Sequence, residues 1–335
     1  MKLPAKNRRI VLAAVPDGMP RNTDFRLEEV PFPECPENGL LVKTCWVSVD
    51  PYLRGRIKGV RTYVDPILVG GLMESGAVGE VYESRHPEHA VGEIVAGMWG
   101  WQDVAAVAAE SVRRVNPAEA PISTALGILG VPGLTAYFGL IDLCAPKPGE
   151  TVVVSGAAGA VGSAVGQIAK ILKCRVVGTA GTARKVEYIR SLGFDEALNY
   201  REDRPYAEVL KRMCPNGIDC YFDNVGGQLT DAVFPLMNTR GRVAVCGQIS
   251  QYNDRAGDVG PRIFSEMISK QLRVEGFIVS RFAGRFAEGR KQLAKWLQDG
   301  RLRYQETIYE GLENAPRAFI GLFEGENTGK ALVKV

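Results

Sequence analysis

The sequence predicts a two-domain α/β protein in which a β-rich part is followed by a doubly wound parallel sheet. Three observations lead to this prediction. The chain has 335 residues, which suits about two domains. Short β-type runs, punctuated by Pro, Gly, Asn and Asp, fill residues 1 to about 120. From Thr151 onward strands and helices alternate, and this rhythm is typical of a parallel sheet covered by helices.

The first part has many short strand-like runs and little helix, which favours a barrel or a sandwich. These runs are residues 9–14, 25–30, 39–47, 77–83, 94–101 and 112–115. The texture changes near Thr124. We therefore expect a first domain over residues 1–125, joined by the tail 301–335, and a second domain over 126–300.

In the second part, apolar residues recur at helical spacing between buried strands. The helix expected at 160–172 has Val161, Val165 and Ile168 on one face. The helix at 182–192 begins with Thr182 as a capping residue and ends at Gly193. Strands are expected at 151–154, 175–179, 197–200, 218–223, 242–246 and 331–335, and a last helix at 284–298.

Composition and charge exclude several classes of protein. The net charge is only +3 and no basic run stands out, so nucleic acid is not an expected partner. The uncharged stretches 120–141 and 151–169 are broken by Gly or Pro and fit buried segments better than membrane spans. The apolar run 10–15 is shorter than a signal peptide needs. We expect a soluble, cytoplasmic protein.

The cysteines and histidines do not favour a metal site. None of the seven cysteines forms a C-x-x-C pair, and their odd number and irregular spacing fit the reduced thiols of a cytosolic protein. His86 and His89 are the two histidines, and their polar segment with Pro87 favours a loop over a zinc site. We expect no metal, and chemistry that uses a cofactor, a tyrosine or backbone groups.

Residues 155–163 have the character of a phosphate-binding loop. The pattern A-x-G-x-x-G begins at Ala157 and is a variant of the dinucleotide-binding fingerprint, with a strand before it and a helix after it. Small residues let the backbone turn tightly and approach a pyrophosphate, and the helix start offers N–H groups and a positive dipole end. The alternative is a glycine-rich turn in an unrelated α/β protein.

The end of the second strand distinguishes the two nicotinamide cofactors. Sites for NAD usually place an Asp or Glu there to bind the ribose 2′-hydroxyl. Residues 177–185 contain no acid and end in Arg184 and Lys185. A cation binds a 2′-phosphate through charge-assisted hydrogen bonds, so we expect NADP(H). The alternative for the two cations is a solvated helix surface.

Six motifs occur in order: residues 49–54 (VDPYLR), 130–140 (GVPGLTAYFGL), 155–163 (SGAAGAVGS), 219–227 (DCYFDNVGG), 246–253 (CGQISQYN) and 326–330 (ENTGK). Over nearly the whole chain, the sequence resembles the zinc-independent medium-chain dehydrogenases/reductases. The resemblance is strongest to the branch of the prostaglandin/leukotriene reductases, plant alkenal double-bond reductases and bacterial curcumin reductases. Residues 70–76 and Trp46 depart from the usual pattern of that branch, which leaves the size of the substrate open.

This resemblance implies a GroES-like β-rich catalytic domain and a Rossmann domain, a homodimer, and reduction of the C=C bond of α,β-unsaturated aldehydes or ketones by NADPH. It implies that the pyrophosphate lies against Gly159, Ala160, Val161 and Gly162, and the 2′-phosphate against Lys185 and Tyr200. The rest of the implied cofactor site is Asn224, Cys246, Gly247, Gln248, Ile249, Ser250, Phe277, Ile278, Val279 and Asn327. Thr135 is expected either to meet the nicotinamide or to cap the helix that follows it.

Tyr252 is the candidate for the main catalytic group. Hydride transfer to the β-carbon of an enone leaves negative charge on the carbonyl oxygen, which needs a hydrogen-bond donor. A phenol with a pKa of about 10 stays protonated and can donate at neutral pH. The alternative for Tyr252 is a loop aromatic that only shapes the pocket. Tyr52 and Tyr63 are weaker candidates for lining a substrate pocket, with core packing as the alternative for Tyr52.

Two other functions fit the same cofactor site. A quinone oxidoreductase of the same superfamily would share the fold and pass electrons to quinones, although residues 250–253 favour the enone hypothesis. A non-catalytic NADPH-binding protein, such as a redox sensor, would bind the cofactor without turnover. A candidate donor beside an intact cofactor loop favours catalysis.

Overall fold

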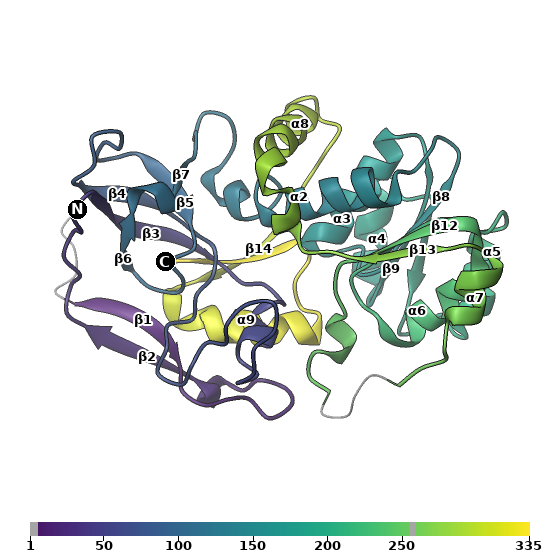
Figure 1. The fold of residues 1–335 in the computed structure, drawn as a ribbon, viewed down its shortest axis with the longest axis horizontal. Coiled ribbons are helices and arrows are strands. Elements are labelled where there is room, and N and C mark those ends of the chain that lie inside the picture. The colour runs from purple at the N-terminus through teal and green to yellow at the C-terminus, as the bar shows by residue number, and fades with distance from the viewer. Residues whose placement is uncertain (1–5, 255–258) are drawn as a thin grey trace. The chain divides into compact units, whose positions relative to one another are not determined.

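A computed structural model describes residues 6–254 and 259–335, and the chain forms two compact units (Figure 1). The first unit runs to Leu126 and also takes in Glu306–Asn327 and Ala331–Val335. The second unit comprises Gly127–Gln305 and Thr328–Lys330. Since the chain leaves the first unit and returns to it, residues far apart in the sequence build one sheet there.

The first unit is β-rich. Among the described residues, a seven-stranded sheet has the order β14-β15-β3-β4-β5-β7 with β6 paired to β3, and β1 and β2 form a separate antiparallel pair. The bounds are β1 (Asn7–Leu12), β2 (Phe25–Val30), β3 (Gly39–Ser48), β4 (Ala77–Ser84), β5 (Ile94–Gly97), β6 (Val104–Ala108), β7 (Arg113–Arg114), β14 (Glu306–Glu310) and β15 (Lys330–Lys334). Two helices, α1 (Leu53–Arg56) and α9 (Ala315–Glu324), accompany these strands.

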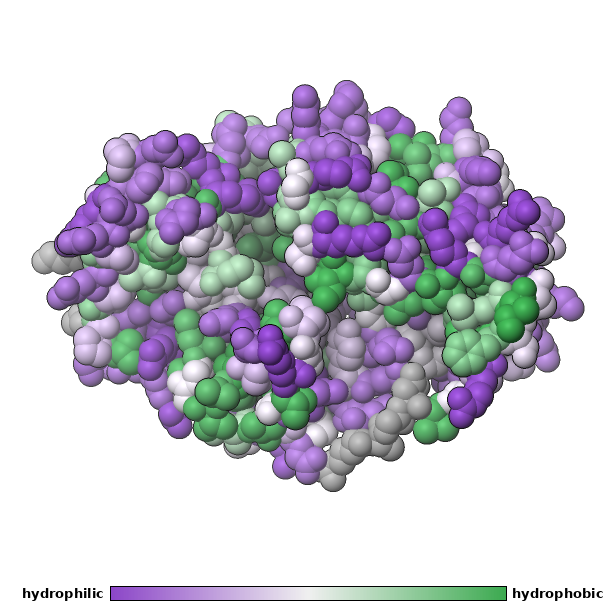
Figure 2. All heavy atoms as spheres, viewed as in Figure 1, coloured by the Kyte–Doolittle hydropathy of each residue, from purple (hydrophilic) through white to green (hydrophobic). Residues whose placement is uncertain are grey.

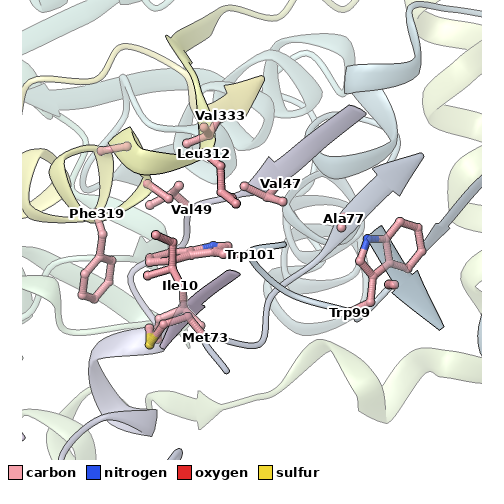
Figure 3. Packing of buried hydrophobic residues seen from close by; sticks show 14 of the residues in the cluster. Ile10, Val47, Val49, Met73, Ala77, Trp99, Trp101, Leu312, Phe319 and Val333 are labelled. Atoms are coloured by element: carbon pink, nitrogen blue, oxygen red, sulfur yellow. The ribbon is translucent and has the colours of Figure 1, made fainter. Parts of the chain in front are cut away.

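An aromatic cluster fills the core of the first unit (Figure 3). The Trp101 ring lies 6.1 Å from that of Phe25 and 6.3 Å from that of Phe319, centroid to centroid. The Trp101 indole N–H donates to the Ser48 carbonyl oxygen at 3.1 Å, and the Trp99 indole N–H donates to Thr44 Oγ1 at 3.1 Å. Both rings therefore bury apolar surface without leaving a buried donor unpaired.

The strand predicted at 94–101 is shorter in the structure. β5 ends at Gly97, and Gly100 has φ of +76°, in the left-handed region that ends strand geometry. A Cβ at Gly100 would lie 3.0 Å from Glu74 Cα, so the backbone there packs too closely for a side chain. The apolar run extends beyond the strand because Trp101 packs into the core after β5 has ended.

The second unit is a parallel sheet with helices, as predicted, and the predicted fold class is confirmed. Its strand order is β10-β9-β8-β11-β12-β13. The strands are β8 (Thr151–Val154), β9 (Arg175–Ala180), β10 (Glu196–Asn199), β11 (Ile218–Asp223), β12 (Met237–Val245) and β13 (Arg273–Gly276). The helices are α2 (Val131–Phe138), α3 (Ala160–Ile171), α4 (Ala183–Ser191), α5 (Tyr206–Met213), α6 (Gly227–Val233), α7 (Phe264–Ser269) and α8 (Phe286–Gln298).

The strand order sets the place of a binding site in this unit. From β8 the chain moves outward to β9 and β10, then returns to the other side of β8 as β11 and moves outward again. The order therefore reverses between β8 and β11. In open parallel sheets ligands bind beyond the carboxyl ends of the strands at such a reversal. We therefore expect a ligand at the loops that follow Val154 and Asp223.

Two further observations concern the helices. The helix expected at 284–298 begins at Phe286, because Val279–Arg285 forms a tighter 3-10 stretch in which Phe282 departs from helical geometry. Within residues 6–254 and 259–335, we find no helix with the length and apolarity that a membrane crossing requires.

Candidate cofactor and active site

The loop after β8 has the geometry that a pyrophosphate requires. Gly159 precedes the first turn of α3 in extended geometry, and Gly156 has φ of +59°. A Cβ at Gly162 would overlap the Gly156 carbonyl oxygen and lie 2.8 Å from Ala157 Cα. The helix start and the loop thus pack backbone on backbone. The first amides of an α-helix have no partner within the helix, and here they lie where an anion is favoured.

The end of β9 leads to a group of cations. The Thr182 hydroxyl accepts from the Lys185 backbone N–H at 3.3 Å and caps α4, as predicted. Burial, together with the charges of Arg201 and Arg184, lowers the pKa of the Lys185 ammonium. A 2′-phosphate is an anion that such a group of cations can bind through charge-assisted hydrogen bonds.

Tyr200 occupies the space beside the last residue before the α4 cap. A Cβ at Gly181 would lie 2.6 Å from Tyr200 Cζ, so the phenol ring packs directly against the Gly181 backbone. The Tyr200 N–H donates to the Ala180 carbonyl oxygen at 3.0 Å, which holds the ring's backbone at the same edge. An acid at this strand end would displace the ring. The packing of Tyr200 therefore requires a residue without a side chain at position 181.

Asn224 follows β11 and joins two loops. Its Nδ2 donates to the Ser155 carbonyl oxygen at 2.8 Å, at the start of the phosphate loop. Its carbonyl oxygen accepts from the Ile249 N–H at 3.3 Å. The predicted residues of the 246–250 run therefore lie beside the loop after β11. Burial and the Asp223 carboxylate raise the pKa of the Cys246 thiol to about 12, which favours the protonated thiol at neutral pH.

Tyr252 closes the same turn. Its phenol oxygen accepts from the Gln248 backbone N–H at 3.2 Å. A Cβ at Gly247 would lie 2.9 Å from that oxygen, so the ring lies over the Gly247 backbone. A phenol can donate its own proton while its oxygen accepts. The structure thus places the candidate donor within the predicted 246–252 segment and fixes its oxygen against the backbone.

The side chains of Phe277 and Thr135 both have partners within the protein. The Phe277 ring meets Phe222 edge to face with centroids 6.1 Å apart, and its N–H donates to the Val245 carbonyl oxygen at 3.3 Å. The half-buried Phe277 side chain therefore packs against Phe222, and we expect the backbone of residues 277–279 to face a ligand. The Thr135 hydroxyl lies inside α2 and donates to the Val131 carbonyl oxygen at 2.8 Å, so it does not cap a helix.

Tyr52, Tyr63 and Asn327 belong to the first unit. Tyr52 immediately precedes α1, and burial, followed by the charge of Asp50, raises the pKa of its phenol. The Tyr63 side chain lies in a loop and is 57% exposed. Tyr52 therefore stays protonated at neutral pH, and both tyrosines keep their predicted role as a proposal.

No zinc-like donor set is present among the described residues, where three or more His, Cys, Asp or Glu side chains do not gather. Instead, His89 Nδ1 lies 3.0 Å from Glu93 Oε2, and His86 Nδ1 accepts from the Glu88 N–H at 3.3 Å. The two histidines thus have local partners in their loop.

Sequence reasoning missed three members of this site. Arg201 adds a second side-chain cation near Lys185, and Ser155 and Asp223 join the phosphate loop to the end of β11. A signal for Asp223 was present, because a charged residue that ends an apolar strand needs partners if it is buried. Ser155 lies 68 residues earlier, so the partner itself could not be identified from a local pattern.

Two family models match the chain: one described as the N-terminal domain of oxidoreductase at residues 8–115, and one described as zinc-binding dehydrogenase at residues 160–298. The NADPH-dependent curcumin reductase of Escherichia coli (strain K12) is 43% identical, over 98% of this chain and 97% of that protein. The 2-alkenal reductase (NADP(+)-dependent) of Nicotiana tabacum is 40% identical, over 98% of this chain and 97% of that protein.

A solved structure of CurA from Vibrio vulnificus in complex with NADPH superposes with a TM-score of 0.93. It is 42% identical, with 98% of this chain and 99% of that chain covered. The names of these relatives agree with the expectation of NADP(H) that was drawn from residues 177–185.

Proposed function

Because the chain belongs to the zinc-independent branch of the medium-chain dehydrogenases/reductases, which includes the curcumin, prostaglandin and 2-alkenal reductases, we propose that it reduces the C=C bond of α,β-unsaturated aldehydes and ketones with NADPH. One observation carries this proposal. The phosphate loop, the cations around Lys185 and the Tyr252 turn all follow the carboxyl ends of neighbouring parallel strands. This is the edge at which such sheets bind ligands.

The residues of the second unit suit NADPH in particular. The backbone of Gly159–Gly162 would hold the pyrophosphate, since it offers a close approach and a helix start. Lys185, Arg201 and Tyr200 would hold the 2′-phosphate, because the charge of Arg201 acts on Lys185, the Tyr200 ring packs on Gly181, and residues 177–185 contain no acid. Asn224, the 246–250 run and the backbone of 277–279 complete the cofactor site in this proposal, with Thr135 and Asn327.

NADPH supplies a hydride when it is bound. The task of the protein is then to stabilise the negative charge that develops on the substrate's carbonyl oxygen. Tyr252 is the proposed donor to that oxygen. Its hydrogen bond with the Gln248 N–H limits the motion of the phenol, so the donor is positioned before the substrate arrives.

The first test is product analysis. Purified protein is incubated with a simple trans-2-alkenal and either NADPH or NADH, and the products are identified by mass spectrometry. A saturated aldehyde formed preferentially with NADPH supports the proposal. An allylic alcohol would contradict it, because the carbonyl group would then be the site of reduction. Consumption of NADPH only with quinones would favour a quinone oxidoreductase instead.

The Tyr252→Phe variant tests the donor. Loss of an oxyanion-type donor commonly lowers kcat by about 10²–10³, and we expect a fall in that range with the affinity for NADPH retained. Tyr82→Phe is the matched control, because Tyr82 is an exposed residue of β4 in the first unit. Equal kcat values for Tyr252→Phe and Tyr82→Phe would remove Tyr252 from the mechanism.

We propose a homodimer that forms through the β13 edge of the second unit. β13 is the last strand of the sheet order, and α7 beside it in the chain exposes Phe264 by 64% and Ile268 by 78%. Figure 2 shows hydrophobic residues gathered where Figure 1 places α7. An open strand edge with an apolar helix suits a second copy related by a two-fold axis.

The test of the dimer is molar mass by light scattering. Ile268→Glu should shift the wild-type dimer toward monomer, whereas Val91→Glu, at an exposed apolar residue of the first unit, should not. A monomeric wild-type protein would contradict the proposal.

We also propose a cytoplasmic location, since all seven cysteines are free thiols, as expected in a reducing compartment. Cell fractionation tests this location.

A further inference from the structure

Asp223, the last residue of β11, is a buried carboxylate with an unusually full set of partners. The residue is only 1% exposed. Oδ1 accepts from Ser155 Oγ at 2.8 Å and from the backbone amides of Val225 and Gly226 at 3.0 Å. Oδ2 accepts from Thr230 Oγ1 at 2.7 Å. A buried charge is tolerated only when such bonds replace its hydration, so this carboxylate holds its neighbours in one arrangement.

One side of this network reaches the phosphate loop. Ser155 is the first residue after β8, and its Oγ donates to Asp223 while accepting from the Asn224 N–H at 2.8 Å. The Asn224 amide also donates to the Ser155 carbonyl oxygen at 2.8 Å. The Ser155 N–H also donates to the Phe222 carbonyl oxygen at 3.1 Å, so four hydrogen bonds join the start of the loop to the end of β11. The loop that approaches a pyrophosphate begins from this junction.

The other side reaches the Tyr252 turn. The Asp223 carbonyl oxygen accepts from the N–H groups of Cys246 at 2.8 Å and Gly247 at 3.1 Å. Val225 links the carboxylate to Ser250. Its N–H donates to Asp223 Oδ1, and its carbonyl oxygen accepts from the Ser250 N–H at 3.1 Å and from the Ser250 hydroxyl at 2.6 Å. The run from 246 to 252 is thus anchored on residues 223–225.

We propose that Asp223 is a positioning residue that holds the phosphate loop and the Tyr252 turn in register with each other. The proposal rests on the function proposed above, because it assigns NADPH to the loop and the proton donor to Tyr252. Asp223 itself touches neither ligand in this assignment. It acts through Ser155 on one side and through the 224–225 backbone on the other.

The isosteric variant Asp223→Asn separates geometry from charge. Tyr221 Oη lies 2.9 Å from both Asp223 Oδ1 and Thr230 Oγ1. In this variant an amide nitrogen can replace Oδ2 and donate to the Thr230 hydroxyl. The Thr230 hydroxyl can then donate to Tyr221 Oη, and the Tyr221 hydroxyl still donates to the remaining oxygen of residue 223. The Asn variant can therefore keep the network, whereas Asp223→Ala leaves the Ser155 hydroxyl and two amides without their acceptor.

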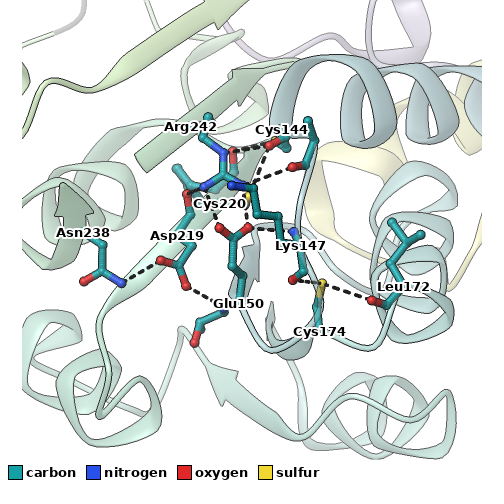
Figure 4. Close-up of polar contacts among 12 residues, drawn as sticks. Cys144, Lys147, Glu150, Leu172, Cys174, Asp219, Cys220, Asn238 and Arg242 are labelled. Carbon is teal, nitrogen blue, oxygen red and sulfur yellow. Dashed lines mark hydrogen bonds and ion pairs between the residues drawn. The ribbon is translucent and has the colours of Figure 1, made fainter. Parts of the chain in front are cut away.

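Asp219 provides a matched control at the other end of the same strand (Figure 4). Its Oδ2 accepts from the Thr151 N–H and its Oδ1 from Asn238 Nδ2, both at 2.8 Å. It is thus also a carboxylate that joins β8, β11 and β12, but it lies at the amino ends of the strands, away from the proposed site. A purely structural role for Asp223 predicts the same consequences for both aspartates.

The experiment compares Asp223→Ala, Asp223→Asn and Asp219→Ala in the full chain. Hydrogen exchange is followed by mass spectrometry in peptides that cover 155–163 and 246–252, and NADPH affinity is measured by fluorescence titration without substrate. For Asp223→Ala we expect faster exchange in both peptides, an NADPH affinity about tenfold lower, and a lower kcat. Asp223→Asn should restore most of each, and Asp219→Ala should change none of them while lowering Tm.

The proposal is overturned if Asp223→Ala and Asp219→Ala give the same exchange and affinity, or if only one of the two peptides responds to Asp223→Ala. Should Asp223→Ala fail to fold, Ser155→Ala tests the loop arm, since it removes the bridging hydroxyl alone and should lower NADPH affinity. Hydrogen exchange requires no turnover. A wrong assignment of the reaction would therefore leave the exchange result intact and appear only in the product analysis.

Discussion

The two ends of β11 carry comparable polar networks that serve different purposes. At the carboxyl end Asp223 is surrounded by loop amides and hydroxyls, and its neighbours lead to the phosphate loop. At the amino end Asp219 lies near Arg242 and Glu150, whose side chains form a forked ion pair (Figure 4). The first network arranges backbone N–H groups that a ligand can use, whereas the second uses its donors within the protein. We therefore propose that the carboxyl end governs binding and the amino end governs stability.

The glycines at the two ends allow the strongest test of this contrast. Gly162→Ala would force a Cβ against the backbone of Gly156 and Ala157, which must then move. Overpacking of this kind costs about 1–3 kcal/mol. Because NADPH binding must restore the original loop geometry against this cost, we expect an affinity about 5- to 150-fold lower. Fluorescence titration with NADPH measures it.

Gly149→Ala is the matched control before β8. Gly149 has φ of +87°, and a Cβ there would meet no atom within 4 Å. The substitution should therefore lower the free energy of unfolding by about 1 kcal/mol through backbone strain and leave NADPH affinity unchanged. An affinity loss of equal size in both variants would contradict the division between the two ends.

Lys185→Met tests the cation group at the carboxyl end. A hydrogen bond to a charged group contributes about 1.5–3 kcal/mol, so we expect an NADPH affinity about 10- to 150-fold lower. The affinity for NADH should not fall, because NADH has no 2′-phosphate for the ammonium to bind. Parallel titrations with both cofactors measure the difference.

Lys170→Met controls for the loss of a lysine on a neighbouring helix. Lys170 Nζ lies 2.8 Å from Asp195 Oδ2 and donates to the Cys174 carbonyl oxygen at 3.2 Å, near the amino end of β9. The Lys170→Met substitution should leave the preference for NADPH over NADH unchanged. If the preference survives in Lys185→Met, the 2′-phosphate must be bound elsewhere.

Arg242→Met tests the amino end. The Arg242 guanidinium donates to both oxygens of Glu150, to the Cys144 carbonyl oxygen at 2.8 Å and to the Ala145 carbonyl oxygen at 3.2 Å. Removing it leaves a half-buried carboxylate without its ion-pair partner, so the free energy of unfolding should fall by about 2–3 kcal/mol. Urea unfolding measures the loss. Unchanged stability, or a loss of NADPH affinity in the folded variant, would contradict a stabilising role.

The contrast between the two ends also shows what sequence could reveal. The strand 218–223 was predicted with its observed bounds, and the phosphate loop with its strand and helix, because each depends on a continuous local pattern. Thr182 was recognised as a cap for the same reason. The predicted strand 94–101 was too long, since the turn at Gly100 depends on its packing against Met73 and Glu74 and not on local hydropathy.

The polar networks could not be predicted, because their members are distant in sequence. Ser155 lies 68 residues from Asp223, and Glu150 lies 92 residues from Arg242. An isolated Asp, Glu or Arg is usually a solvated surface residue, and only the strand order brings these pairs together. Lys185 could be proposed from the end of the second strand and Tyr252 from the 246–253 motif, and both roles stay predictions. Arg201 became visible only when β9 and β10 were placed side by side.

The smallest expected effect is the pH dependence of the amino-end network. Burial alone would raise the pKa of Glu150, but the hydrogen bonds from Arg242 and the Lys147 backbone amide outweigh it and hold this pKa below its ordinary value. A carboxyl group whose pKa is lower in the folded state than in the unfolded state stabilises the fold fully above the unfolded pKa, which is about 4.3. That contribution is lost as pH falls through the folded pKa.

The measurement is the free energy of unfolding of the wild type and Glu150→Gln between pH 6 and pH 3. We expect the wild type to be more stable by a constant amount down to about pH 4.3, and the difference between the two proteins to shrink below it. Glu37→Gln, an exposed residue of the first unit, controls for the general effect of acid. A difference that stays constant to pH 3 would mean that Arg242 does not depend on the ionised Glu150. The stability of the amino end would then rest on its bonds to the Cys144 and Ala145 carbonyl oxygens.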